Sequence, residues 1–249
     1  MCEIGDYHVG AGTLDGRELF ESHDIAVNPV IHLHYVQVMK PQLDAPRGDL
    51  ERLFDALKAE WKLEDLRCEP HVLAGFQPSL REGKWYVTVA VREGREIVGI
   101  WPGFKDRLLG VAVDVGSTTV AAHLCDLASG QVIESAGLMN PQIRFGEDLM
   151  SRVSYVMLND GGDVEMTRAI REALNTLIAE LTADADATPE DVFELTFVGN
   201  PIMHHLLLGI SPVQLGVSPF ALAVDSAINL PASALDLSVA AGARDPRSE

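Results

Sequence analysis

The residues with the most evident chemistry fall in one polar turn between two apolar runs, at positions 114–119. The turn contains Asp114, Gly116, Ser117, Thr118 and Thr119. Glycine permits a backbone conformation that a side chain would forbid, and consecutive N–H groups in such a turn can bind a phosphate. A carboxylate beside it can hold Mg²⁺ through water, because Mg²⁺ prefers oxygen ligands and keeps several waters. The pattern predicts a phosphate-binding turn, with an ordinary polar hairpin as the alternative.

A second candidate site follows a predicted strand at 193–198, where Gly199 and Asn200 precede Pro201. Asn is a preferred helix-capping residue, and Pro suits the first position of a helix. The N-terminus of a helix presents free N–H groups to a ligand. Gly199 and Asn200 are therefore candidate cofactor-binding residues.

The histidines and cysteines form no evident metal site. His204 and His205 are adjacent on the predicted helix and point in different directions, so they cannot jointly bind one metal. His32 and His34 share a strand face but have no evident third ligand, which favours a structural or surface role. The three cysteines are far apart and odd in number, which predicts reduced thiols and a cytoplasmic protein. They are Cys2, Cys68 and Cys125.

The elements that must position the turn begin at Leu108. We predict strands at 111–113, 120–124, 131–137 and 193–198, and helices at 146–157 and 164–183. Asp163 is expected to cap the longer helix. Asp148 and Arg152, with Glu147, fall near the start of the shorter helix. They could compensate its dipole and form an i,i+4 ion pair, or face the ligand cleft.

The preceding half has the pattern of a small α/β domain at 29–105. We predict strands at 30–38, 71–74, 85–91 and 96–101 and a helix at 49–61. Residues 1–28 are expected to form a linker or mobile tail, and 244–249 a solvated tail. The break at Pro102-Gly103 predicts a boundary between Trp101 and Leu108.

The amino-acid composition argues against two classes of binding partner. The 249 residues are 47% hydrophobic, enough for a sizeable core, and carry a formal net charge of −18. Such an acidic chain repels nucleic-acid backbones and anionic lipid, so we expect neither as a partner. The sequence begins without a secretory signal and has no apolar run long enough to span a bilayer.

Three sequence blocks resemble known families. The Asp-x-Gly-Ser-Thr-Thr turn between apolar strands resembles the first phosphate motif of the actin, sugar-kinase and heat-shock ATPase (ASKHA) superfamily. The blocks Met139–Arg152 (MNPQIRFGEDLMSR) and Val198–His205 (VGNPIMHH) resemble ATP-dependent reductive activators of corrinoid proteins, an iron–sulfur protein family. The resemblance covers roughly residues 27–243.

The resemblance implies a mixed α/β fold, with residues 29–105 as the family's middle domain and 108–243 as the first ASKHA lobe. It implies ATP and Mg²⁺ as cofactors, with Asp114 as the catalytic residue that organises Mg²⁺ and water. The activity would help to reduce cob(II)alamin to cob(I)alamin in a corrinoid methyltransferase system. Its partners would be a corrinoid protein or corrinoid methyltransferase and an electron-donating ferredoxin or flavoprotein.

Two parts of that resemblance have no counterpart in the sequence. A [2Fe–2S] cluster needs four cysteine thiolates, and Cys2 is the only cysteine before Cys68. No second phosphate turn or adenosine site follows Asp114, so the resemblance implies half of an ATP site. An exposed apolar face is then expected where the second lobe would close, which could support a homodimer. The alternatives are a non-catalytic corrinoid-protein-binding module or remnant, and a sugar or acyl kinase.

Overall fold

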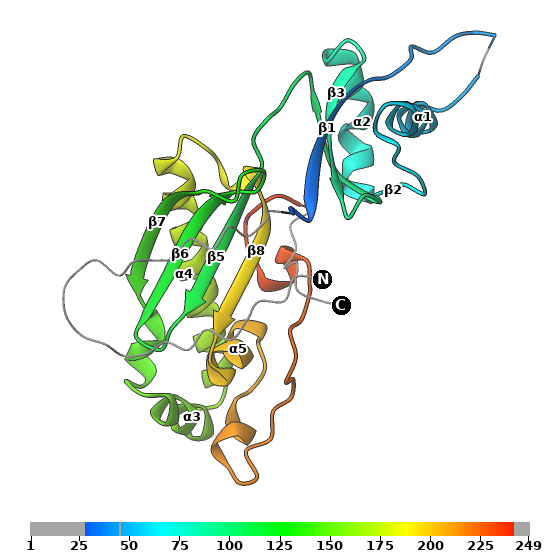
Figure 1. The fold of residues 1–249 in the computed structure, drawn as a ribbon. Helices are drawn as coiled ribbons and strands as arrows, with labels where there is room; N and C mark the ends of the chain where they lie inside the picture. The colour runs from blue at the N-terminus through cyan, green and yellow to red at the C-terminus, as the bar shows by residue number, and fades with distance from the viewer. Residues whose placement is uncertain (1–27, 45, 242–249) are drawn as a thin grey trace.

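A computed structural model of the protein describes residues 28–44 and 46–241. They form a mixed α/β structure with two four-stranded mixed sheets, each associated with helices (Figure 1). The tails that the sequence predicts at 1–28 and 244–249 lie, except for Asn28, outside the described residues.

The first sheet has the strand order β1-β3-β4-β2. Its strands are β1 (Ile31–Gln37), β2 (Arg67–Cys68), β3 (Tyr86–Arg92) and β4 (Glu96–Pro102), and its helices are α1 (Asp49–Trp61) and α2 (Pro70–Glu82). The strand predicted at 71–74 is wrong, because this segment lies inside α2. Val72, Phe76 and Leu80 are all buried at helical spacing, and this periodicity outweighs the local preference for a strand.

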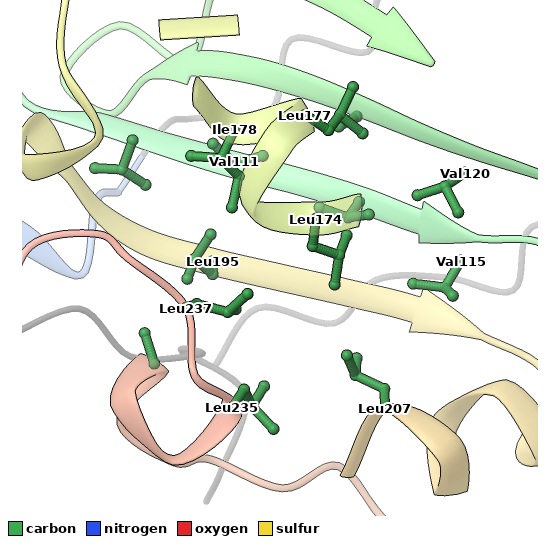
Figure 2. Close-up of a cluster of buried hydrophobic side chains, with 14 of the residues drawn as sticks. Val111, Val115, Val120, Leu174, Leu177, Ile178, Leu195, Leu207, Leu235 and Leu237 are labelled. Atoms are coloured by element: carbon green, nitrogen blue, oxygen red, sulfur yellow. The ribbon is translucent and has the colours of Figure 1, made fainter. Parts of the chain in front are cut away.

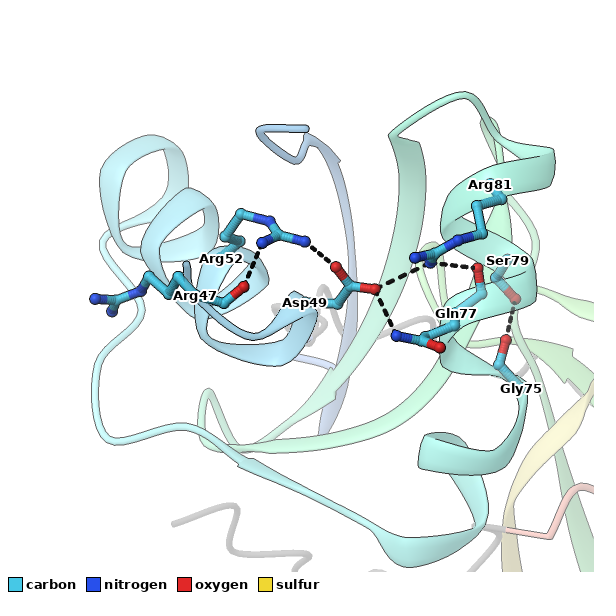
Figure 3. Close-up of polar contacts among 7 residues, drawn as sticks. All are labelled: Arg47, Asp49, Arg52, Gly75, Gln77, Ser79 and Arg81. Atoms are coloured by element: carbon cyan, nitrogen blue, oxygen red, sulfur yellow. Dashed lines mark hydrogen bonds and ion pairs between the residues drawn. The ribbon is translucent and has the colours of Figure 1, made fainter. Parts of the chain in front are cut away.

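Helices α1 and α2 of this unit are joined through one carboxylate, that of Asp49 (Figure 3). Its Oδ2 accepts hydrogen bonds of 2.9 Å from Gln77 Nε2 and from Arg81 Nη1, both in α2. Its Oδ1 accepts from Arg52, one turn further along α1. The charge of Arg52, which is buried, is therefore paired within its own unit.

The second sheet has the order β7-β6-β5-β8, so the strand at Gly110 does not join the first sheet. Its strands are β5 (Leu109–Val115), β6 (Thr119–Asp126), β7 (Val132–Met139) and β8 (Val192–Gly199). β5, β6 and β7 are successively antiparallel, whereas β8 returns parallel to β5. Its helices are α3 (Leu149–Leu158), α4 (Gly162–Asp184) and α5 (Pro201–Leu208).

Helix α4 packs on one face of this sheet and supplies much of its core (Figures 1 and 2). The predicted apolar stripe of α4 is buried: Met166, Ile170, Leu174, Leu177, Ile178 and Leu181. Full burial of one such side chain contributes about 1.5–3 kcal/mol. The cap differs from the prediction, because Gly161, with a φ of 79°, precedes the helix and Asp163 lies within its first turn.

The opposite face of the second sheet is mixed rather than uniformly apolar. Met139 and Val198 are exposed there, but so are Asp114, Thr119 and His123. The register places these residues on neighbouring strands. The expected apolar face is therefore interrupted by polar groups.

The two units pack directly on each other. Ile31, Ala90 and Val98 of the first unit belong to the same buried cluster as the core of the second. Trp101 meets Phe193 edge-on, with ring centroids 5.5 Å apart. These contacts form a continuous apolar junction between β4 and the beginning of β8.

Candidate functional site

The predicted turn connects β5 to β6 and lies at one edge of the second sheet. Asp114 stands two residues before Gly116, at the end of β5, and its side chain is exposed, whereas Val113 and Val115 are buried. Since side chains alternate along a strand, Asp114 lies on the face opposite the core. Parallel pairing places Val115 beside Gly199, so both candidate sites meet at the same sheet edge.

Three consecutive carbonyl groups of the turn accept hydrogen bonds from residues that sequence reasoning did not select. Asn140 donates from Nδ2 to Gly116 O (2.7 Å) and from its backbone N–H to Thr118 O (2.8 Å). Arg152 donates from Nη2 to Ser117 O. The side chains of Asn140 and Arg152 are both fully buried. Asn140 and Arg152, both from the segment 139–152, thus hold the backbone of the turn from its buried side.

The N–H groups of this turn, unlike its carbonyl groups, are not all hydrogen-bonded in the described structure. Within the described residues, the backbone N–H groups of Ser117 and Thr118 donate no hydrogen bond. Gly116 is needed for space rather than for its backbone angle, because its φ is not positive and an added Cβ would lie 2.5 Å from Thr119 O. The expected conformational reason for this glycine is therefore wrong, and close packing of the turn replaces it.

The N-terminus of α5 does not offer the free donors that the sequence predicts. The Oδ1 of Asn200 accepts from Ile202 N (3.0 Å) and Met203 N (3.1 Å), and Pro201 has no N–H. The His204 N–H donates to Asn200 O. Asn200 is therefore confirmed as a cap, and the cap occupies the N–H groups that a ligand would use.

The two histidines of α5 differ as expected. His205 is buried, and its Nδ1 and Nε2 contact Pro201 O (2.7 Å) and Ala223 N (3.1 Å). His204 is half-buried, and burial, followed by the proximity of His205, lowers its pKa. His205 thus fixes the segment after α5, while His204 borders an apolar pocket that Leu230 also lines.

The start of α3 differs from the predicted ion pair. Asp148 caps the helix, with Oδ1 accepting from Ser151 N (2.7 Å) and Oδ2 from Ser151 Oγ (2.8 Å). These hydrogen bonds hold the pKa of Asp148 below its usual value. Arg152 instead turns inward to the β5–β6 turn, so the i,i+4 pair between Asp148 and Arg152 does not form. Glu147 is exposed.

Metal-ligating side chains do not gather elsewhere in residues 28–44 and 46–241. No group of three or more His, Cys, Asp or Glu residues there could hold a metal ion. His34 packs edge-on against Trp61, with ring centroids 4.8 Å apart. The described part of the chain also has no helix with the length and apolar character required to cross a membrane.

The fold and site define a mixed α/β protein with a braced, hydroxyl-rich turn at the edge of its second sheet. The chain belongs to the RACo family: residues 109–244 match the family model of the RACo middle region, and residues 21–107 match that of the RACo linker region. In the family's own naming, the first unit is therefore the linker region and the second is the middle region.

Two relatives agree with this assignment. The chain is 26% identical over 212 residues to the corrinoid activation enzyme RamQ of Eubacterium limosum, covering 82% of this chain and 34% of RamQ. It also resembles the solved structure of a reductive activator for corrinoid, iron-sulfur protein, with a TM-score of 0.77 and 28% identity. That match covers 90% of this chain and 36% of the solved chain, so the chain spans about a third of the length of both relatives.

Proposed function

We propose that this chain is the phosphate-binding part of an ATP-dependent reductive activator of corrinoid proteins. The proposal rests on the β5–β6 turn, in which the carbonyls of Gly116, Ser117 and Thr118 all accept hydrogen bonds from buried residues. The N–H groups of Ser117 and Thr118 stay available within the described structure. Successive unpaired N–H groups at a turn are donors of the kind that can bind an anion.

The residues at this edge fit Mg²⁺ and a nucleotide phosphate. The exposed Asp114 would hold Mg²⁺ through water, and the N–H and hydroxyl groups of residues 117–119 would bind phosphate oxygens. Gly199 and Asn200 would shape the neighbouring wall, with Asn200 acting through its cap on α5. Bound Mg-ATP supplies the free energy of phosphoryl transfer, to which proteins contribute mainly positioning and electrostatic stabilisation.

The proposed reaction is the one-electron reduction of cob(II)alamin to cob(I)alamin in a corrinoid methyltransferase system. A reduced ferredoxin or flavoprotein donates the electron, and ATP favours the conformation in which the corrinoid protein accepts it. In this proposal residues 108–243 form the first ASKHA lobe, because an antiparallel β5-β6-β7 unit is followed by helices and a strand parallel to β5. The same proposal requires a second lobe and a [2Fe–2S] centre, which other polypeptide segments would supply.

A second candidate is a corrinoid-protein-binding module without ATPase activity. The specific observation that favours it is the capped N-terminus of α5, which removes one of the two expected sources of phosphate donors. In that case the turn would have a structural role only. A sugar or acyl kinase would also require a substrate base, and no observation supports one.

Titration of Mg-ATP into the chain, followed by amide NMR, separates these functions. We expect saturable shifts at Ser117, Thr118 and Thr119 and slow ATP turnover. Asp114→Asn should weaken the Mg²⁺-dependent affinity by about tenfold, or about 1.4 kcal/mol. Asp160→Asn, which removes an exposed carboxylate from the loop after α3, is the matched control. Binding to a corrinoid protein without any nucleotide-dependent shift would favour the binding module.

A further inference from the structure

We propose that Arg152 is a positioning residue of the phosphate turn and that its charge is reserved for an anion bound there. The inference rests on the proposed function, because it assigns a role to a residue behind the same turn. The ligand class is a phosphate oxyanion, as in the polyphosphate chain of a nucleotide. Arg152 would act through the turn rather than by touching the reacting atoms.

Arg152 is held by four neighbours that fix its guanidinium group. Nε donates to Gly146 O (3.0 Å), Nη1 contacts Gln142 Oε1 (3.5 Å) and the sulfur of Met203 (3.2 Å), and Nη2 donates to Ser117 O. The side chain is fully buried. A planar guanidinium in such a setting has little freedom, so it fixes the orientation of the peptide that follows Ser117.

The charge of Arg152 has no carboxylate partner in the described residues. Its acceptors are two backbone carbonyls, an amide oxygen and a sulfur, and none of the ion pairs found there includes it. Asp148 is the acidic group whose field reaches it, but that carboxylate is exposed and is bonded to Ser151. A buried charge is costly unless it is paired, so an anion on the turn would supply the missing partner.

The position and the charge of Arg152 therefore both favour an anion on the turn. The guanidinium bonds the carbonyl of Ser117, and the next peptide N–H is that of Thr118, which donates no hydrogen bond in the described structure. Polarisation along this peptide strengthens the N–H as a donor, and the low-dielectric surroundings preserve the field of the arginine. A phosphate placed on the turn gains from both effects.

Three variants separate the charge of Arg152 from its packing. Arg152→Met keeps the length of the side chain and removes the charge and the fork. Gln142→Glu keeps the guanidinium and supplies a buried carboxylate within reach of Nη1, although it removes the hydrogen bond from Gln142 Nε2 to Met166 O. The control is Arg67→Met, which makes the same change of net charge at an exposed position in β2 of the other unit. Retention of the amide shifts of α4, which packs on the second sheet away from the turn, verifies that the second unit is folded in each variant.

The probe is inorganic tripolyphosphate, followed through the amide shifts of Ser117 and Thr118 and compared with Mg-ATP. We expect Arg152→Met and Gln142→Glu each to weaken tripolyphosphate binding by at least about tenfold, while Arg67→Met leaves it unchanged. Unchanged affinity in Gln142→Glu would overturn the charge role, and unchanged affinity and turn shifts in Arg152→Met would overturn the inference entirely. Wild-type binding of tripolyphosphate but not of Mg-ATP would instead support the inference and refute the proposed function. Binding of neither probe would overturn both.

Discussion

The two units bury arginine in opposite ways. In the first unit, Arg92 of β3 lies within 3.6 Å of three carboxylates, those of Glu69, Glu96 and Glu194. In the second unit, Arg152 is even more deeply buried but contacts neutral acceptors. The charge of Arg92 is compensated where it lies, whereas the charge of Arg152 is available to the turn above it.

This difference separates charges that are paired within the fold from one that, in our proposal, serves a ligand. Arg92 of β3 pairs with Glu194 of β8, and Arg81 of α2 pairs with Asp49 of α1. Both pairs join elements that must stay fixed relative to each other. Arg152 joins elements as well, but it does so through carbonyl groups, which leaves its net charge uncompensated. We therefore expect the paired arginines to matter mainly for stability, whereas the proposed role of Arg152 concerns ligand binding.

The largest effect is expected from removing the charge of Arg92, which is paired with carboxylates. Arg92→Met should lower the free energy of unfolding by about 3–5 kcal/mol, because it leaves buried carboxylates without their cation. Urea unfolding followed by circular dichroism measures this loss. Addition of Glu194→Gln should restore part of the stability, and Arg67→Met should stay within about 0.5 kcal/mol of wild type. A loss below about 1 kcal/mol in Arg92→Met would show that the pairing is not structural.

The next effect concerns Asn140, which supports the same turn without a charge. Asn140→Ala should lower the free energy of unfolding by about 1–3 kcal/mol, because Gly116 O and Gln142 N each lose a buried partner. Asn175→Ala is the matched control, since its amide bonds Asp236 O and Ser238 N at a less buried site. Equal losses in the two variants would contradict a special role for burial beneath the turn.

Local patterns explain how much of this could be predicted. The helix at 49–61, the hairpin around Gly116 and the cap at Asn200 follow from periodicity and residue preference, which act over a few positions. The interactions of Asn140 and Arg152 with the turn span 24 and 35 residues, and no local rule encodes such distances. The signal is present in the Asn140–Arg152 block, but its spacing suggests a surface pair with Asp148. Only the tertiary structure turns Arg152 inward.

A smaller effect is expected from the cap of α5, which separates a structural residue from a ligand-binding one. Asn200→Ala should lower the free energy of unfolding by about 1 kcal/mol, because the N–H groups of Ile202 and Met203 lose their acceptor. Asn200→Asp retains an acceptor oxygen and should recover most of this loss in urea unfolding. If Asn200→Asp is as unstable as Asn200→Ala, the cap is not what this side chain contributes.

The smallest expected effect lies in a partly exposed counterpart to Arg92, the ion pair of Lys105 with Asp191 at the junction (2.8 Å). Burial raises the pKa of Asp191, but hydrogen bonds from Lys105 and Thr188 outweigh it, so the pKa is lowered overall. A lowered carboxyl pKa gives stability that is present above the unfolded value of about 3.9 and is lost as the pH falls through the folded value. Because the pair is partly exposed, we expect less than about 1 kcal/mol. The free energy of urea unfolding should therefore fall slightly less steeply between pH 6 and pH 3 in Asp191→Asn than in wild type. The same pH dependence in both proteins would show that the charge of Asp191 contributes nothing to stability, in contrast to that of Arg92.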